Sequence, residues 1–336
     1  MPSKNWELLA NFESFELVQR EYTARHGRKP NIRHAREIAA PFSHARSYFR
    51  SAHSAEPTVK PLLLYYGVVS LARGVTLMLS RGMREANLAL SHGLSVKNWG
   101  GVLSDDKPDF SALRIEVNAT GSFVDLGKAT EFKSLLRHGV SEVNVTYMNP
   151  PVPVRAEFSL GDILSRLPAL QDDYMRWRGD TRCTYLAIET ANDGKCRLRW
   201  NKRHRSWVTR QAAEELFRDT AFVLDTETPE HVEFKGPDDV NALPGLTDHP
   251  ESFNIPSLWL TALYPGGVKL SKICTFFALS YMMGMLVRYY PMQWTALIRG
   301  QFADAALPTL EASVKLVEDD FPQVVEDFLK SPPGGA

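Results

Sequence analysis

Cysteine is scarce in this sequence, and the short motifs that mark many enzyme classes are absent. The 336 residues include three cysteines, at widely spaced positions that fit neither a zinc-ligand set nor a framework of paired disulfides. Buried free thiols are the simpler interpretation, while Cys183 facing Cys196 across a hairpin is the alternative. The chain has no phosphate-binding glycine loop, nucleophile elbow or metal-ligand cluster. It therefore predicts no metal site and no bound cofactor.

Neither sign of charge dominates the sequence. The 39 basic and 39 acidic side chains give a formal net charge of zero, so no field of the whole protein attracts nucleic acid or an anionic membrane. The first residues lack the apolar core of a secretory signal. Residues 273–287 form a mostly apolar run of 15, shorter than the roughly 20 residues that a membrane span requires. We expect a cytoplasmic protein that contacts no membrane, with this run as a buried central helix.

Apolar residues at helical spacing dominate both ends of the chain. Between residues 6 and 18 an apolar side chain recurs at every third position, which predicts one amphipathic helix of about five turns that ends near Gly27. Further helices are predicted at residues 34–52, 61–90, 269–300 and 307–329, and Gly82 is expected to kink the second of these. The second and third are too apolar to be exposed, so we expect them to be in direct contact.

The middle of the chain has the two-residue alternation of β-strands. Apolar residues alternate within 111–126 on either side of a turn, which predicts a β-hairpin. Ser159 and Asp162 have the spacing of a capping box, so a short helix should begin there. Residues 236–267 are rich in Pro, Asp and Gly and are interpreted as irregular loop. Further strands are predicted at residues 140–148, 183–190, 195–200, 221–227 and 231–236.

The order of helices, strands and helices favours an α+β fold. Because the apolar helices at the two ends need a partner, we predict a helical bundle built from the N- and C-terminal helices with a β-rich middle segment. The predicted regions are residues 1–100, helical; residues 101–268, β-rich; residues 269–330, helices that complete the bundle; and residues 331–336, a disordered tail.

Five segments of the chain, taken in order, carry a family resemblance. They are ARSYFRSAH (45–53), PLLLYYGVVSLARG (61–74), SHGL (91–94), SLGDILSRLPALQDDY (159–174) and ALSYMMGMLVRYYPMQW (278–294). Through these segments the sequence resembles the bacterial YaaC-like family, and the similarity follows the same order through most of the chain. The resemblance implies a soluble bacterial protein that is mainly helical at its ends. It implies no established activity and brings no catalytic residues.

Arginine and histidine on the predicted helices permit a nuclease hypothesis. Metal-independent ribonucleases of the HEPN class use an Arg and a His of a helical bundle, since His transfers a proton near neutral pH and Arg stabilises the charge of a phosphorane. Arg46 and His53 have the spacing of that motif, whereas Arg84 and His92 have one intervening residue too many. Other Arg–His pairs in the chain fit as well, so the spacing alone is weak. A helix cap at His92 and solvated side chains elsewhere are the simpler interpretation.

Residues 197–210 form the densest basic segment. Basic side chains neutralise phosphates and indole rings stack on bases, so this segment is the natural candidate for contact with RNA or DNA. A basic β-hairpin that its tryptophans anchor to a core is the simpler interpretation. The residues assigned to the nucleic-acid surface are Arg199, Trp200, Lys202, Arg203, Arg205 and Trp207.

Arg288 and Tyr289 directly follow the apolar run near the C-terminus. A buried Arg288 would need a carboxylate partner, because an uncompensated buried charge costs several kcal/mol. An arginine that holds two helices together is the simpler interpretation, and a ligand-binding arginine is the alternative. The candidate partners are Glu37, Glu56 and Glu85.

Two hypotheses of different classes follow from these observations. The first is a soluble bacterial protein that acts by binding and self-association, with the apolar helices forming the bundle core and a homodimer face. The second is a HEPN-like endoribonuclease that acts as a toxin or antiviral defence effector, with Arg46, His53, Arg84 or His92 in its site. The sequence leaves open whether the protein is an enzyme.

Overall fold

The computed structural model of the protein describes residues 6–131, 136–138, 141–143, 151–190, 196–202, 207–218, 221–236, 246–247 and 257–330. The predicted tail at 331–336 and part of the strand predicted at 140–148 lie outside these ranges. The helices are α1 (Glu7–Asn11), α2 (Phe15–His26), α3 (Ile32–His53), α4 (Lys60–Leu79), α5 (Trp99–Leu103), α6 (Ser122–Ala129), α7 (Leu160–Leu164), α8 (Gln171–Arg178), α9 (Arg210–Phe217), α10 (Lys272–Tyr289), α11 (Pro291–Ile298) and α12 (Leu307–Lys330).

The strands form antiparallel sheets. A three-stranded sheet has the order β1-β2-β5, a six-stranded sheet has the order β10-β11-β6-β7-β9-β8, and β3 pairs with β4. The strands are β1 (Leu94–Lys97), β2 (Arg114–Val117), β3 (Leu136–His138), β4 (Ser141–Val143), β5 (Glu157–Ser159), β6 (Cys183–Thr190), β7 (Cys196–Asn201), β8 (Val223–Glu227), β9 (His231–Gly236), β10 (Leu246–Thr247) and β11 (Ser257–Thr261).

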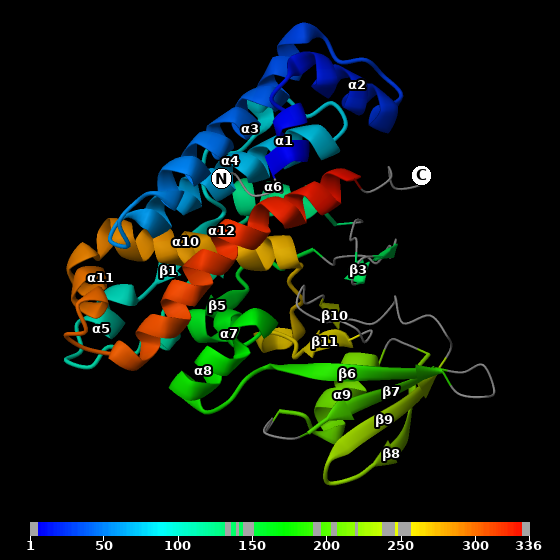
Figure 1. Ribbon diagram of the computed structural model, residues 1–336, viewed down its shortest axis with the longest axis vertical. Coiled ribbons are helices and arrows are strands. Elements are labelled where there is room, and N and C mark those ends of the chain that lie inside the picture. The colour runs from blue at the N-terminus through cyan, green and yellow to red at the C-terminus, as the bar shows by residue number, and fades with distance from the viewer. Residues whose placement is uncertain are drawn as a thin grey trace.

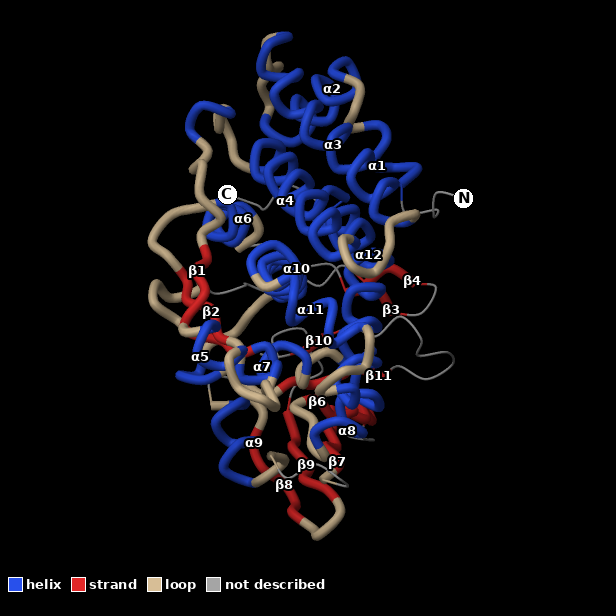
Figure 2. Tube along the Cα trace, turned by 90° about the vertical axis from the view of Figure 1, so that its left-hand side faces the viewer, coloured by secondary structure: helices blue, strands red, loops and turns tan. Residues whose placement is uncertain are grey.

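Four long helices, α3, α4, α10 and α12, form a helical bundle (Figures 1 and 2). The central helix is α4, which contacts the other three. Two of its glycines face α3: a Cβ on Gly67 would lie 2.6 Å from the ring of Phe49, and a Cβ on Gly74 would lie 2.7 Å from the ring of Phe42. Glycine at these positions therefore permits the close approach of α3 to α4. The predicted contact between the apolar helices from the two ends of the chain is confirmed by the packing of α4 on α10.

Two separate hydrophobic cores stabilise the fold. The larger one joins the bundle helices to the three-stranded sheet and to α5, α6, α7 and α8. The smaller one lies between the six-stranded sheet and α9, where Trp200 and Phe234 of the sheet pack with Phe217 of the helix. Figure 1 shows this sheet and α9 at the opposite end of the molecule from α2. The combination of a helical bundle with small antiparallel sheets confirms the α+β class.

The predicted helix at residues 61–90 is too long. α4 ends at Leu79, and the chain turns away through Gly82, whose φ of 75° lies in the left-handed region that favours glycine. Gly82 therefore follows the end of the helix instead of kinking it. Residues 85–87 form only a short 3-10 turn.

The predicted single helix at residues 269–300 is two helices. α10 ends at Tyr289 and α11 begins at Pro291, and the two axes are bent by 103°. Proline has no amide hydrogen to continue the helical ladder, and it disfavours the helical conformation in the residue before it. By length and composition α4 is apolar enough to cross a membrane, but 67% of its apolar window is buried, as in the core helix of a globular protein.

The predicted N-terminal helix is also divided. α1 and α2 are separated by residues 12–14, and Ser14 caps α2 by accepting a hydrogen bond from the amide of Leu17 at 3.4 Å. A serine oxygen satisfies one of the amides that a helix start leaves without a partner. The threefold spacing of apolar residues continues through this break because both helices pack on the same core.

The predicted hairpin at residues 111–126 is wrong in its second half. β2 pairs with β1 and β5, while residues 122–129 form α6. Phe123 and Leu126 are three residues apart and both buried, which suits one face of a helix. Gly121, with a φ of 137°, turns the chain from the strand into this helix. A short apolar run fits either periodicity, and tertiary packing selected the helix.

The predicted loop at residues 236–267 contains two strands. β11 pairs with β6 over five residues, from Ser257 opposite Ala187 to Thr261 opposite Cys183. The pairing of β6 with β7 shows whether Cys183 faces Cys196. Cys183 lies at one end of β6, whereas Cys196 pairs with Thr190 at the other end. The two cysteines do not face each other, and all three cysteines are buried and outside any disulfide, as the simpler interpretation predicted.

Candidate functional site

Four of the five segments that carry the family resemblance meet at one surface. Helix α3 contributes Tyr48, α4 contributes Tyr65 and Tyr66, and the loop before β1 contributes His92. Helix α10 contributes Tyr281, Arg288 and Tyr289. Ring contacts of 5.4–5.9 Å connect His92 to Tyr65, Tyr65 to Tyr66, and Tyr66 to Tyr48. We call this set the Tyr–His–Arg patch; its members are Tyr48, Tyr65, Tyr66, His92, Tyr281, Arg288 and Tyr289.

His92 is held in the patch from two sides. Its Nδ1 lies 2.6 Å from the hydroxyl oxygen of Tyr65, which is fully buried on α4, and its carbonyl accepts a hydrogen bond from the amide of Phe123 at 3.0 Å. Gly93 follows with a φ of 82°, and a Cβ there would lie 3.1 Å from the backbone of Gly121. The glycine fits this turn where a side chain would not. His92 is thus fixed against α4 and is not the cap of that helix.

Burial and positive charge act together on the imidazole. The pKa of His92 is lowered, first by burial and second by the guanidinium of Arg288. Burial raises the pKa of Tyr65 and raises the pKa of Tyr281 to about 12. At neutral pH His92 is therefore uncharged and both phenols keep their protons. When the Tyr65 hydroxyl donates to Nδ1, Nε2 of the neutral ring carries the hydrogen and can donate to a ligand; when Nδ1–H donates to the hydroxyl oxygen, Nε2 can accept a proton from a ligand.

The outer part of the patch combines exposed aromatic rings with one cation. Tyr289 is 59% exposed and Tyr48 is 36% exposed, while Tyr66 is half-buried between them and the core. Arg288 is exposed; its Nη1 lies 3.4 Å from the Tyr66 hydroxyl, and its guanidinium lies 5.1 Å from the centre of the Tyr289 ring. Exposed rings stack on planar ligands and a guanidinium binds an anion, so the patch can contact a base and a phosphate at once.

The structure places Arg288 at the surface and not in the core. No carboxylate contact of Arg288 is present in the part of the chain that the structure describes, and Glu37 pairs instead with Arg84. An exposed guanidinium keeps its hydration, so it needs no buried counter-ion. Between the two interpretations of Arg288, this position suits a ligand contact better than a lock between helices.

Three of the four residues assigned to the nuclease site contact different carboxylates. Arg46 and His53 lie two helical turns apart on α3, and Arg84 lies in the turn after α4. No contact of an assigned Arg with an assigned His occurs among the described residues, and their catalytic role stays a prediction. The ion pairs are Arg46–Glu13 at 2.5 Å, His53–Glu318 at 2.9 Å and Arg84–Glu37 at 2.7 Å.

The two tryptophans of the basic segment lie in the smaller core. Trp200 is fully buried on β7, Trp207 is 6% exposed, and their ring centres are 5.1 Å apart. A buried indole cannot stack on a base without leaving the core, so this placement favours the anchored hairpin over a nucleic-acid surface. Arg199 pairs with Glu233 at 2.7 Å, and Lys202 pairs with Glu227 at 2.6 Å. Arg203 and Arg205 lie outside the described residues.

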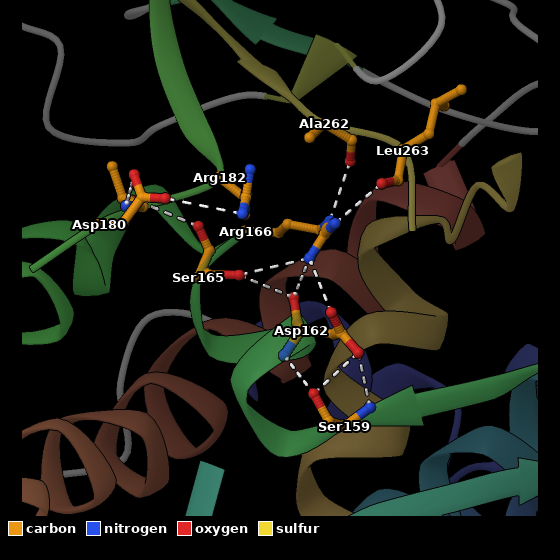
Figure 3. A network of polar contacts seen from close by, with 9 residues as sticks. Ser159, Asp162, Ser165, Arg166, Asp180, Arg182, Ala262 and Leu263 are labelled. Atoms are coloured by element: carbon orange, nitrogen blue, oxygen red, sulfur yellow. Dashed lines mark hydrogen bonds and ion pairs between the residues drawn. The ribbon is translucent and has the colours of Figure 1, made fainter. Parts of the chain in front are cut away.

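A buried arginine that the sequence did not single out joins the bundle region to the six-stranded sheet (Figure 3). Arg166, which is 8% exposed, donates hydrogen bonds to the carbonyls of Ala262 at 3.0 Å and Leu263 at 2.8 Å, directly after β11. It also donates to the carbonyl of Asp162 at 2.8 Å and covers the ring of Tyr264 at 4.5 Å. The guanidinium thus has partners within the protein on both its edge and its face, so we assign Arg166 a structural role.

Within the described ranges no group of three or more His, Cys, Asp or Glu side chains is arranged to hold a metal ion. His92, Arg288 and Tyr289 were assigned from the sequence, but the tyrosines around them were not. The available signal was the Tyr65-Tyr66 pair, since hydroxyl groups in an otherwise apolar helix need polar partners. The spatial neighbours of that pair come from distant segments.

The model of one family, described as YaaC-like Protein, matches residues 10–329. The chain belongs to the YaaC-like protein family. Comparison with curated proteins gave no match, and comparison with solved structures gave none. The match of the family covers α2 to α12, so it includes every element that contributes to the Tyr–His–Arg patch.

Proposed function

We propose that this member of the YaaC-like family is a cytoplasmic bacterial binding protein that recognises single-stranded RNA at the Tyr–His–Arg patch. The observation that carries the proposal is the placement of Arg288 between Tyr66 and the exposed Tyr289. A guanidinium flanked by tyrosine rings offers one phosphate contact and adjacent stacking surfaces, which is the combination that single-stranded nucleic-acid sites use.

The charge of the whole chain limits how such binding works. A formal net charge of zero supplies no long-range attraction, so affinity must come from the patch itself. Stacking of one base on an aromatic side chain contributes about 1–3 kcal/mol, and each phosphate contact adds a salt-dependent term. The expected complex is therefore short, engages few nucleotides, and weakens moderately as salt increases.

Fluorescence anisotropy with a labelled 12-nucleotide RNA tests this proposal. We expect Tyr289→Ala to weaken binding roughly 5- to 150-fold, which corresponds to the loss of one stacked base. Arg288→Glu should weaken binding and reduce its salt dependence. Arg218→Glu is the matched control, because it makes the same charge change at an exposed position directly after α9. Binding that is unchanged in both patch variants, or reduced equally in the control, contradicts the proposal.

Metal-independent cleavage of RNA at the same patch is the second candidate. One observation favours it: His92 accepts or donates a hydrogen bond with Tyr65 at 2.6 Å while Arg288 acts electrostatically on the same imidazole. When Nδ1–H of the neutral imidazole donates to the Tyr65 hydroxyl oxygen, Nε2 can take the proton of a ribose 2′-hydroxyl, and a guanidinium can stabilise the charge that develops on the phosphate. In this form of the hypothesis Arg288, and not Arg84, is the partner of His92.

A cleavage assay separates binding from catalysis. If the patch cleaves RNA, His92→Ala should abolish cleavage in the presence of a chelator while RNA binding persists. His53→Ala is the informative comparison, because His53 is 75% exposed and paired with Glu318 away from the patch. Loss of cleavage in His53→Ala with retention in His92→Ala would place the site on α3 instead. An intact RNA after incubation with the parent protein leaves binding as the function.

Self-association through the apolar helices also stays a prediction. The exposed apolar side chains that such contact could use are Met292, 72% exposed at the start of α11, and Tyr289, 59% exposed at the end of α10. Sedimentation velocity of the parent protein and of Met292→Glu measures this directly. A monomer at all concentrations would contradict the dimer.

A further inference from the structure

A basic pocket lies at the other end of the bundle from the six-stranded sheet, where α2 ends, α3 begins and the chain leaves α4 (Figure 1). Its volume is about 580 Å³, within the range of sites for small molecules. Four cationic side chains and two imidazoles line it, and it shares no lining residue with the Tyr–His–Arg patch. These residues are Arg28, Lys29, Arg81, Arg84, His26 and His34.

The walls of the pocket are held by hydrogen bonds between the segments that form it. The hydroxyl of Tyr22 on α2 accepts from the amide of Gly82 at 2.7 Å, and Nε2 of His26 lies 2.9 Å from the carbonyl of Met78 on α4. The side chain of Asn31 accepts from the amide of His34 at 2.8 Å and caps α3. The turn after α4 is thus fixed against α2 by contacts within the chain.

Positive charge inside the pocket is only partly neutralised. Among the residues that the structure describes, no Asp or Glu lines it. Of its four cations, Arg84 pairs with Glu37, which is not one of the lining residues. Within the described part of the chain, Arg28, Lys29 and Arg81 form no ion pair. Three uncompensated cations around one concave surface create a field that attracts an anion.

The backbone adds to this field at the same place. α3 is 22 residues long and begins at Ile32, directly after Asn31 of the pocket lining. The first amides of a helix have no intrahelical acceptor, and the helix dipole places partial positive charge there. Asn31 satisfies the amide of His34, which leaves those of Ile32 and Arg33 for another acceptor.

His34 supplies an independent sign that the pocket is incomplete without a ligand. Its side chain lines the pocket and is 7% exposed; the backbone of Met83 is a hydrogen-bond partner of the ring, but no hydrogen bond of standard geometry reaches Nε2. Buried polar atoms are nearly always paired, so an unpaired one at a basic pocket indicates a missing partner. Burial and the charge of Arg84 lower the pKa of His34 and outweigh the backbone of Met83 and the charge of Glu37, which raise it; an anion in the pocket would raise this pKa further.

We propose that this pocket binds the phosphate group of a nucleotide-sized phosphomonoester. Arg28, Lys29 and Arg81 neutralise the dianion, the first amides of α3 donate to its oxygens, and Nε2 of His34 shares a proton with one of them. The pocket is larger than a phosphate ion, so the sugar or base of the ligand occupies the rest, beside the ring of Tyr22. The site is separate from the RNA surface proposed above, and neither depends on the other.

Isothermal titration calorimetry with AMP and with adenosine tests the proposal on the full chain. AMP should bind, inorganic phosphate should bind more weakly and compete with it, and adenosine should not bind because it lacks the phosphate. Arg81→Glu and Lys29→Glu, both at exposed positions, should each weaken AMP binding by at least about tenfold. Arg218→Glu makes the same charge change outside the pocket and should leave the affinity within about twofold.

Thermal unfolding provides a second test of the same proposal. AMP should raise the melting temperature of the parent protein and of Arg218→Glu equally, and at the same AMP concentration it should raise that of Arg81→Glu less. Equal binding of adenosine and AMP, equal weakening in the control, or no binding of either would overturn the proposal. Binding to vesicles that contain phosphatidylglycerol without binding to AMP would overturn the assignment to a small molecule, because the phosphate would then belong to a lipid headgroup.

Discussion

Gly284 of α10 lies against Tyr65 of α4 at the point where the two apolar helices cross. A Cβ on Gly284 would stand 2.7 Å from the Cβ of Tyr65, closer than two carbon atoms approach without a bond. The same tyrosine holds His92 through its hydroxyl group. The packing of the bundle and the position of the imidazole therefore depend on one contact.

Substitution of Gly284 should destabilise the bundle. Gly284→Ala adds a methyl group where none fits, and we expect a loss of about 1–3 kcal/mol in the free energy of unfolding. Gly284→Asp adds a buried charge as well, and so does Leu286→Asp at a fully buried position, so each should cost more than about 3 kcal/mol. Urea-induced unfolding measures these differences.

Gly100 is the matched control for this series. It also lies in a helix, α5, but a Cβ there would meet no atom within 4 Å. Gly100→Ala should leave stability within about 1 kcal/mol of the parent protein, with stabilisation as the expected sign. An unfolding curve of Gly284→Asp that matches the parent curve would contradict the packing of α10 on α4.

The helices and strands that the sequence predicted well are those with one unambiguous period and clear ends. β6 and β9 have the predicted bounds, and α3 and α12 are within about two residues of prediction. The capping box at Ser159 and Asp162 is present, with both reciprocal hydrogen bonds. In these places local propensity, turn chemistry and burial agree, so the local sequence decides the structure.

The predictions are wrong where a short apolar pattern fits both a strand and a helix, or where a glycine or proline ends a helix inside an apolar segment. Phe123 and Leu126 suit a strand or a helix, and only packing on the bundle core distinguishes them. Pro291 and Gly82 marked helix ends that the apolar composition concealed. The site was harder to predict, because Tyr48, Tyr65 and Tyr281 lie on three different helices and only the packing of these helices brings them together.

Loss of Arg166 should weaken the junction between the bundle region and the six-stranded sheet. Arg166→Ala leaves the carbonyls of Ala262 and Leu263 without their donor, and we expect a loss of about 3–5 kcal/mol in the free energy of unfolding. Arg182→Ala is the control. The Arg182 side chain is 43% exposed and forms a long ion pair of 3.6 Å with Asp180, so the loss of unfolding free energy should stay below about 1 kcal/mol. Similar losses in both variants would argue against a special role for Arg166.

The ion pair of Glu37 with Arg84 should make stability depend on acid pH. The hydrogen bond from Arg84 lowers the pKa of Glu37 from 4.5 to about 2. Between pH 4.5 and pH 2 the Glu37 carboxylate binds a proton more readily in the unfolded chain than in the folded one. The stabilisation that the ion pair gives is therefore complete above pH 4.5 and is lost as the pH falls toward 2. Arg84→Gln should therefore reduce the loss of unfolding free energy between pH 5.5 and pH 3, measured by urea denaturation. An unchanged pH dependence would indicate that the pair does not form in solution.

Arg288 should control the protonation of His92. Its positive charge disfavours the imidazolium form, so Arg288→Gln should raise the pKa of His92 toward the ordinary value of 6.5. NMR titration of the histidine ring protons measures this shift, with His92→Gln to assign the signal and Arg218→Gln as a control that leaves it in place.

The lowered pKa of His92 also affects stability. A histidine whose pKa is lowered by folding makes the protein less stable as the pH falls below 6.5, because the unfolded chain then binds the extra proton. Arg288→Gln should make that decline smaller. A His92 pKa that stays the same or falls in this variant would show that Arg288 points away from the imidazole, and both functions proposed for the patch would lose their central contact.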